Sequence, residues 1–351
     1  MLRLPRPPLL GLDISPEAVR IVELSETRGH FRIEHADSEP LPPGAVNDRE
    51  IQDVESVSRA IRVMLDRSRI RTRSVASALP GPAVIVKIIS LPAGLDEEGI
   101  GDQIRFEGGQ YIPFSINAVN FDFTVLGPDK SRKGYSQVLL VACKKETVED
   151  RAAVLEEGGL KPKIIDVKQF VLWELYERFH GPQSGHGNGA VILVDIGSVN
   201  TNIHAFQNGQ PVYSREHSFG IARLTDEIAR HFGLDPADAQ RMQRYGGLPQ
   251  GYENAVRDPF IRQLAQEIFR TLDFFQASMP DITISSIQLF GAGANLPGLA
   301  LQIQNLTHFP VESPDPFSGM ELAPRISKRF LESDGSSLAT ACGLALRRFP
   351  A

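Results

Sequence analysis

Only two of the 351 residues are cysteines, and neither has a second cysteine close enough in sequence to form a zinc or redox motif. Cys143 and Cys342 both lie in apolar stretches, a pattern that is typical of small core residues. We therefore expect neither a disulfide framework nor a cysteine-based metal site, which fits a reducing, cytoplasmic compartment.

Long apolar runs are missing too, and none approaches the ~20 residues that a membrane-spanning helix requires. The first ten residues, MLRLPRPPLL, are too short and too rich in proline for a secretory signal. The 37 basic residues are scattered among 43 acidic ones, so no basic stripe indicates a nucleic-acid partner. With 42% apolar residues, the composition predicts a soluble globular protein of about two domains.

One pattern occurs twice: an apolar run that ends in an aspartate and a small polar turn. The copies are LLGLDIS, which ends at Ser15, and ILVDIGS, which ends at Ser198. Each is followed by two segments of alternating apolar and polar residues, which predict two more strands, and the turns Arg28-Gly29 and Asn208-Gly209 separate those strands. A repeat about 180 residues apart predicts two related α/β halves with a ligand cleft between them.

The intervening residues predict a separate module. Residues 83–167 show the element order β-α-β-β-α-β, which would make a small sandwich of sheet and helices. The first half is then expected from residues 1–82, 168–189 and 318–351, and the second from residues 190–317. A glycine-rich stretch at 180–190 is expected to be a loop.

The two aspartates of the repeat, Asp13 and Asp195, are candidate ligands of a hydrated Mg²⁺ ion. An aspartate at the end of a strand facing a cleft can hold this ion, which keeps its waters and takes one or two carboxylates. Gly197, Ser198 and Thr201 would offer small side chains, hydroxyls and backbone N–H groups to phosphates. Either aspartate alone is better explained as a turn residue, but two matching turns favour a ligand.

A third turn follows a later strand, in LFGAGANLPGL. Glycines directly after a strand let an anionic or flat ligand lie against the backbone, and the next helix offers N–H donors. Gly291, Gly293 and Ala294 are the candidate contact residues.

The chain resembles the actin-like ATPase superfamily and, within it, the PilM family of type IV pilus assembly proteins and their relative FtsA. The resemblance rests on GLDISPEAVRIVEL, QYIPFSINAVNFDF, VDIGSVNT, GAGANLPGL and GLALR. It implies a duplicated actin-like (ribonuclease H-like) α/β fold, with 83–167 as an FtsA/PilM-type subdomain. It also implies ATP or ADP with Mg²⁺ as cofactors, and a role in twitching motility.

Three departures from the family pattern bear on the nucleotide. Ser15, a candidate nucleotide contact, and Pro16 stand where relatives have Gly-Ser, and Pro16 has neither an N–H nor a hydroxyl. The adenosine-contacting helix carries Gln240 and Gln243 in place of a glutamate and a lysine, and Ala292 replaces a glycine. Neutral amides bond without charge assistance. We therefore expect weak nucleotide binding and at most a slow ATPase.

No catalytic residue is assigned. Hydrolysis requires a residue that positions water in line with the terminal phosphate. Asp166, Lys168 and Gln169 occupy the connection where relatives place such a residue, but capping of the helix that begins there explains them better.

The resemblance implies a cytoplasmic nucleotide-binding scaffold that docks the N-terminal tail of a PilN-like protein at the inner face of the inner membrane. Val84–Leu91 and Tyr111–Phe114 could line the peptide groove or simply belong to the core. Dimers or filaments are implied as well. The alternatives are a sugar kinase, which would need a carboxylate base in a polar pocket, and an FtsA-like division protein. FtsA proteins carry an amphipathic membrane segment after the last helix, which is not expected here because the sequence stops at Ala351.

Overall fold

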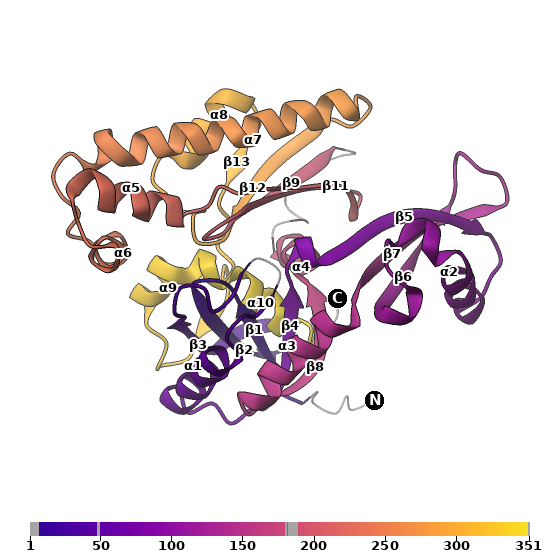
Figure 1. Ribbon diagram of the computed structural model, residues 1–351, viewed down its shortest axis with the longest axis horizontal. Coiled ribbons are helices and arrows are strands. Elements are labelled where there is room, and N and C mark those ends of the chain that lie inside the picture. The colour runs from indigo at the N-terminus through magenta and orange to yellow at the C-terminus, as the bar shows by residue number, and fades with distance from the viewer. Residues whose placement is uncertain (1–6, 48–49, 180, 182–188, 350–351) are drawn as a thin grey trace.

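The computed structural model describes residues 7–47, 50–179, 181 and 189–349. Two mixed sheets with helices on their faces make up the body of the molecule, and a third, smaller sheet projects from one side (Figure 1). Most of the loop expected at 180–190 lies outside the described residues.

The first sheet has six strands in the order β14-β3-β2-β1-β4-β8. The hairpins β1-β2-β3 are antiparallel, whereas β4, β8 and β14 each run parallel to a neighbour. The strand bounds are β1 Leu10–Ile14, β2 Ala18–Thr27, β3 His30–Pro40, β4 Ser74–Leu79, β8 Lys161–Val167 and β14 Glu321–Leu322.

The second sheet has five strands in the order β11-β10-β9-β12-β13. It repeats the arrangement of the first, with antiparallel β9-β10-β11 followed by the parallel strands β12 and β13. The strand bounds are β9 Ala190–Ile196, β10 Thr201–Gln207, β11 Gln210–His217, β12 Ile284–Phe290 and β13 Val311–Glu312. The predicted duplication of an α/β half is confirmed.

The predicted hairpin turns also match in both halves. Arg28 and Gly29 have φ angles of 54° and 81°, and Asn208 and Gly209 have φ angles of 51° and 78°. Two consecutive residues with positive φ form the turn whose twist suits a two-residue hairpin. The same local geometry therefore joins β2 to β3 and β10 to β11.

Helices form three layers around the two sheets. α4 and α10 lie between the sheets, where a shared core includes Tyr176, Phe206 and Phe290. α1 and α3 cover the outer face of the first sheet, and α5, α7 and α8 cover the outer face of the second (Figure 1). The bounds are α1 Val54–Arg67, α3 Lys145–Glu157, α4 Lys168–Phe179, α5 Ala222–Phe232, α6 Pro236–Tyr245, α7 Asp258–Ser278, α8 Leu299–Thr307, α9 Lys328–Asp334 and α10 Ala339–Leu346.

The inserted module is smaller than the predicted 83–167. Its sheet has the order β5-β7-β6, with α2 on one face; the bounds are β5 Val84–Pro92, α2 Glu97–Tyr111, β6 Val119–Pro128 and β7 Tyr135–Lys144. The last two predicted elements belong elsewhere: β8 pairs with β4, and α3 buries Val154 and Leu155 in the core of the first half. The element order was right, but its assignment to one module was wrong, because pairing and not chain order decides which sheet a strand joins.

The long helix α7 begins without a side-chain cap. A π-helical turn at Glu253–Arg257 leads directly into α7. The side chain of Asp258 instead accepts a hydrogen bond from Nε of Arg257 at 3.0 Å. Backbone N–H groups that a cap would satisfy are taken up by the preceding turn.

Candidate functional site

The two repeated aspartates occupy the same position in their strands, the residue before the last. Alternate residues of β1, including Leu12, pack on the outer core, so Gly11 and Asp13 face the layer between the sheets. In β9 the outer core contains Val194 and the inner core Leu193, so Asp195 likewise faces inward. The period of two in each strand therefore directs both carboxylates towards the space between the halves.

Asp13 and Asp195 line one cavity of about 80 Å³. Three other predicted site residues line it as well, namely Ser15, Gly197 and Ser198. Further lining residues were not assigned a ligand role from the sequence: Arg151, Asn200, Asn202, His204 and Glu216. The structure thus brings the two aspartates to a common cavity, and their role towards a nucleotide stays a prediction.

Lys168, the first residue of α4, forms an ion pair with Asp195. Its Nζ lies 2.7 Å from Oδ2 of Asp195, and the aspartate side chain is only 3% exposed. Burial alone lowers the pKa of Lys168, but Asp195 and then Asp13 outweigh that effect, so the pKa is raised and the ammonium stays charged. Lys168 was considered as a water-positioning residue; in the structure it holds one of the predicted metal ligands.

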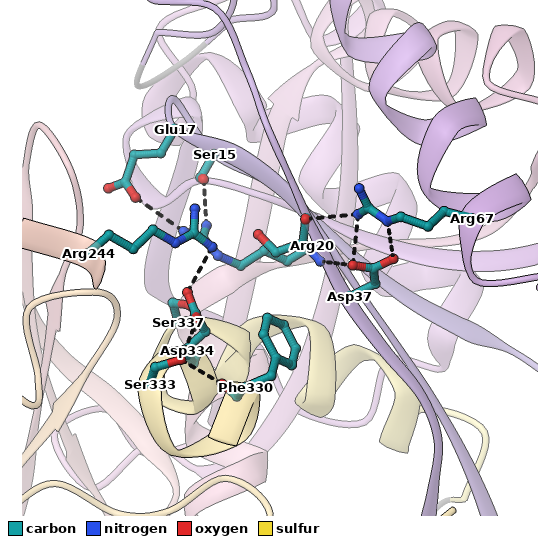
Figure 2. Close-up of polar contacts among 11 residues, drawn as sticks. Ser15, Glu17, Arg20, Asp37, Arg67, Arg244, Phe330, Ser333, Asp334 and Ser337 are labelled. Carbon is teal, nitrogen blue, oxygen red and sulfur yellow. Dashed lines mark hydrogen bonds and ion pairs between the residues drawn. The ribbon is translucent and has the colours of Figure 1, made fainter. Parts of the chain in front are cut away.

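The first hairpin is held by an arginine of β2. Arg20 donates from Nη1 to Oγ of Ser15 at 2.7 Å and from Nη2 to Glu17 at 3.2 Å (Figure 2). Oγ of Ser15 also donates to the carbonyl of Ala18 at 2.9 Å. The hydroxyl of Ser15 is therefore engaged in shaping the turn.

The second hairpin caps a helix. The carbonyls of Gly197 and Ser198 accept the N–H groups of Ile221 and Ala222 at the start of α5, at 3.0 and 2.9 Å. Gly220 makes this approach possible, because a Cβ there would lie 2.1 Å from the carbonyl oxygen of Ser198. This arrangement ties the loop after Asp195 to α5.

Thr201 lies deeper than predicted. Its side chain is buried, and Oγ1 donates to the carbonyl of Phe219 at 2.6 Å. Among the described residues it is not one of those that line the cavity. Its hydroxyl therefore serves the internal packing of β10 and does not face a ligand here.

The glycine turn after β12 packs against the end of β9. The N–H of Gly293 donates to the carbonyl of Ile196 at 3.1 Å, and Ala294 is buried. A Cβ on Gly291, which has φ +86°, would lie 2.5 Å from that carbonyl and 2.7 Å from Oδ1 of Asp195. The turn touches the aspartate directly, so these glycines are required by close backbone approach, and the described cavity lining does not include them.

The two glutamines of α6 lie away from this cavity. Gln240 is exposed, and Oε1 of Gln243 accepts a hydrogen bond from Thr225 of α5 at 2.5 Å. The next residue, Arg244, pairs with Asp334 of α9 at 3.0 Å and so joins the two halves (Figure 2). The structure therefore places α6 at the border of the halves without bringing its glutamines to the aspartates.

Asp166 and Gln169, the other residues considered for water, are engaged elsewhere. Oδ2 of Asp166 lies 2.6 Å from Nε of Arg347, just beyond α10. Gln169 is buried, with its side chain near Gly81. Neither observation supports a role in hydrolysis, and Asp166 anchors the end of β8 to the C-terminal helix.

His204 of β10 is the one histidine among the described residues that line the cavity. Burial lowers its pKa to about 4, against an opposing effect of Asp195. Its Nδ1 lies 2.8 Å from Oγ of Ser214. The ring is therefore neutral at physiological pH.

This burial predicts a pH dependence of stability. Between pH 6.5 and about 4 the unfolded chain binds a proton at His204 that the folded chain does not, so stability falls as pH falls through this window. We expect His204 to account for a loss of about 2–3 kcal/mol in the free energy of unfolding between pH 7 and 4.5. Urea unfolding at both pH values should show this loss in the wild type and much less in His204→Gln. The exposed control His30→Gln should keep the wild-type loss, and an equal loss in His204→Gln would contradict the assignment.

The lining residues that sequence reasoning missed come from β10 and β11, from the turn before β10 and from α3. His204 and Arg151 sit within regular elements whose pattern is read as core, and nothing local distinguishes them. Asn200 and Asn202 lie within seven residues of Asp195, so the motif itself was a usable signal for them. Arg151 had none, because its helix precedes β9 by more than 30 residues.

A sequence model of the family described as type IV pilus assembly protein PilM matches residues 11–349. The chain belongs to the PilM family. Within a solved structure of a PilM–PilN type IV pilus biogenesis complex, the similar chain is 28% identical. That match has a TM-score of 0.82 and covers 99% of this chain and 100% of the other. Type IV pilus assembly is therefore the process to which this PilM family member belongs.

Two more distant structures share the fold. The ethanolamine utilization protein EutJ of Carboxydothermus hydrogenoformans is 14% identical, with a TM-score of 0.60 over 98% of this chain and 90% of its own. MreB5 of Spiroplasma citri, solved bound to ADP, is 12% identical, with a TM-score of 0.52 over 96% and 94%. These likenesses support the actin-like fold of the PilM family member and nothing further.

The cavity is compatible with a hydrated Mg²⁺ ion. It contains three carboxylates, those of Asp13, Asp195 and Glu216, against the cations Lys168 and Arg151. A negatively charged phosphate would require more positive charge in such a space, and Mg²⁺ takes one or two carboxylates together with water and phosphate oxygens. Within the described part of the chain no group of three or more His, Cys, Asp or Glu side chains is arranged to hold a metal ion by itself.

No described helix is long and apolar enough to cross a membrane.

Proposed function

We propose that this chain is a nucleotide-binding scaffold that docks the cytoplasmic N-terminal tail of a PilN-like inner-membrane protein. The observation that supports it most is the likeness, over 99% of the chain, to a protein solved in a PilM–PilN complex. Location at the inner face of the inner membrane would follow from the partner, because the tail it binds lies on that side.

The inserted module offers a suitable docking surface. Half of the ten large apolar side chains that are exposed in the described residues lie on it: Ile88, Leu95, Phe106, Phe114 and Val125. Exposed apolar side chains on a projecting module favour contact with a partner. In addition, β5 lies at an edge of its sheet, so its outer backbone groups can pair with an extended peptide.

The two segments proposed to line the groove divide between core and surface. Ile89 and Leu91 of β5 are buried in the core of the inserted module, as is Ile112. Ile88 is 39% exposed and Phe114 is 42% exposed, with Nζ of Lys144 5.2 Å from the Phe114 ring. The exposed members are the ones available to a peptide.

The nucleotide would bind with its phosphates at the cavity between the hairpins. Gly197 and Ser198 line that cavity, and Asp13 and Asp195 would hold Mg²⁺, which neutralises phosphate charge when it is bound. Lys168 already occupies Oδ2 of Asp195, so the ion and the ammonium would share that carboxylate. This competition, with the neutral glutamines of α6, supports weak binding and gives no support to fast hydrolysis.

The docking proposal predicts that one charged substitution on β5 impairs binding of the tail peptide. Ile88→Asp should raise the dissociation constant for the N-terminal peptide of the PilN protein from the same genome at least 10-fold, because it puts a charge into an apolar contact. The matched control is Val63→Asp on α1, a residue 42% exposed on another surface, which should leave binding unchanged. Calorimetric titration measures both. If the wild-type protein does not bind the peptide but releases phosphate in the presence of a simple sugar, the kinase alternative is favoured.

A further inference from the structure

Arg151 is a buried cation that faces the candidate nucleotide cavity. It lies on α3, is only 4% exposed, and lines the same cavity as Asp13 and Asp195. Its Nη1 atom is buried and has no hydrogen-bond partner among the described residues. A buried guanidinium nitrogen without an acceptor is costly, and most such groups in native proteins have a partner.

The charge of Arg151 persists despite its burial. Burial lowers its pKa to about 10, and Asp13 acts in the opposite direction, so the side chain remains protonated at neutral pH. A protonated guanidinium with an open N–H suits an oxyanion that accepts two hydrogen bonds side by side, as phosphate does. The missing acceptor is therefore best supplied by a phosphate in the cavity.

The position of Arg151 indicates which phosphate. The helix α6, whose glutamines are expected to contact the adenosine, belongs to the second half, whereas Arg151 belongs to the first. A nucleotide bound in that orientation directs its last phosphate towards the first half. The phosphate that would reach Arg151 is then the one that a diphosphate lacks.

The helix that carries Arg151 is joined directly to the inserted module. β7, the central strand of that module, ends at Lys144, and α3 begins at Lys145 with no residue between them (Figure 1). Arg151 follows the junction by about 9 Å of helix. A shift of Arg151 towards a ligand would therefore move the C-terminal end of β7, the strand that lies between β5 and β6.

We propose that Arg151 is a ligand of the terminal phosphate of a bound nucleoside triphosphate and that α3 transmits its presence to the inserted module. This inference rests on the proposed nucleotide-binding function. It assigns to the triphosphate a regulatory part in partner docking that a diphosphate cannot play. The alternative is that Arg151 only neutralises Asp13, in which case both nucleotides would depend on it equally.

Calorimetry with the full chain, Mg²⁺ and either ATP or ADP tests the first part. Arg151→Met should weaken ATP binding about 10- to 100-fold and change ADP binding less than about threefold, because charge-assisted hydrogen bonds to one phosphate are lost. Arg151→Lys keeps the charge, so its ATP affinity should lie between those of the wild type and Arg151→Met. The matched control is Arg178→Met: Nη2 of Arg178 also lacks a hydrogen-bond partner in the described residues, but the side chain packs over Phe31 outside the cavity. This control should bind both nucleotides as the wild type does.

Hydrogen exchange tests the second part. In the wild type, ATP should slow exchange in residues 84–144 more than ADP does, and Arg151→Met should remove that difference while Arg178→Met keeps it. Equal losses of ATP and ADP affinity in Arg151→Met, or no loss, would overturn the inference. The proposed nucleotide-binding function of the wild-type protein would still stand. A wild-type protein that binds neither nucleotide would instead overturn the proposed site itself, and the inference with it.

Discussion

Replacing Lys168 with methionine should lower the free energy of unfolding by about 3 kcal/mol, because it leaves the carboxylate of Asp195 buried without its cation. The aspartate side chain is 3% exposed, and Nζ of Lys168 lies 2.7 Å from it. The lysine side chain is 24% exposed, so the expected loss is at the lower end of the range for broken buried pairs. Urea denaturation at pH 7 measures the change.

A double-mutant cycle separates the pair from its surroundings. Lys168→Met combined with Asp195→Asn should lose less stability than the two single variants together, with a coupling free energy of at least about 1.5 kcal/mol. Arg59→Met is the control: Arg59 pairs with Glu55 on the exposed face of α1, and its loss should cost less than about 0.5 kcal/mol. Additive effects in the cycle would show that the ion pair does not hold Asp195 in place.

Replacing Gly11 with alanine should destabilise the protein by about 3 kcal/mol or more. A Cβ at Gly11 would lie 1.9 Å from the carbonyl oxygen of Ala341 and 2.4 Å from the backbone nitrogen of Ala345, both in α10. Backbone atoms cannot rotate aside as a side chain can, so α10 would have to move off β1. Thermal or urea unfolding of Gly11→Ala measures the loss.

Gly81→Ala is the matched control for this substitution. Gly81 lines the same cavity as Asp13, but a Cβ there would meet its nearest neighbour, the His204 ring, at 3.7 Å. The added methyl group makes ordinary contact, and the change in unfolding free energy should stay within about 1 kcal/mol. A Gly11→Ala variant as stable as Gly81→Ala would mean that α10 does not rest on β1 as the structure shows.

The two halves and their aspartates could be predicted because the signals are local. Alternation in β1 and β9 sets which face each residue takes, and Asp13 and Asp195 occupy the same place in that alternation. The turns Arg28-Gly29 and Asn208-Gly209 specify hairpins within a few residues. Each of these features is determined by neighbours along the chain, so pattern and propensity are sufficient.

The sheet that each strand joins could not be predicted from local sequence in the same way. β8 follows α3 just as β6 follows α2, and the sequence contains nothing that separates the two units. β8 nevertheless pairs with β4, from which it is separated by more than 80 residues. Long-range pairing of this kind depends on which edge is free once the rest has folded.

The residues of the site show the same difference between local signals and long-range packing. Thr201 was predicted to face a ligand because it follows the Asp195 turn, yet its hydroxyl donates to the carbonyl of Phe219, just beyond β11. Arg151 carried no signal, yet it reaches the cavity through the packing of α3 on the first sheet. The sequence by itself therefore determined the strands, the turns and the two inward aspartates, since backbone period and turn chemistry act over a few residues. Only the tertiary structure decided which cations meet those aspartates, because charges from distant segments come together only when the helices that carry them pack.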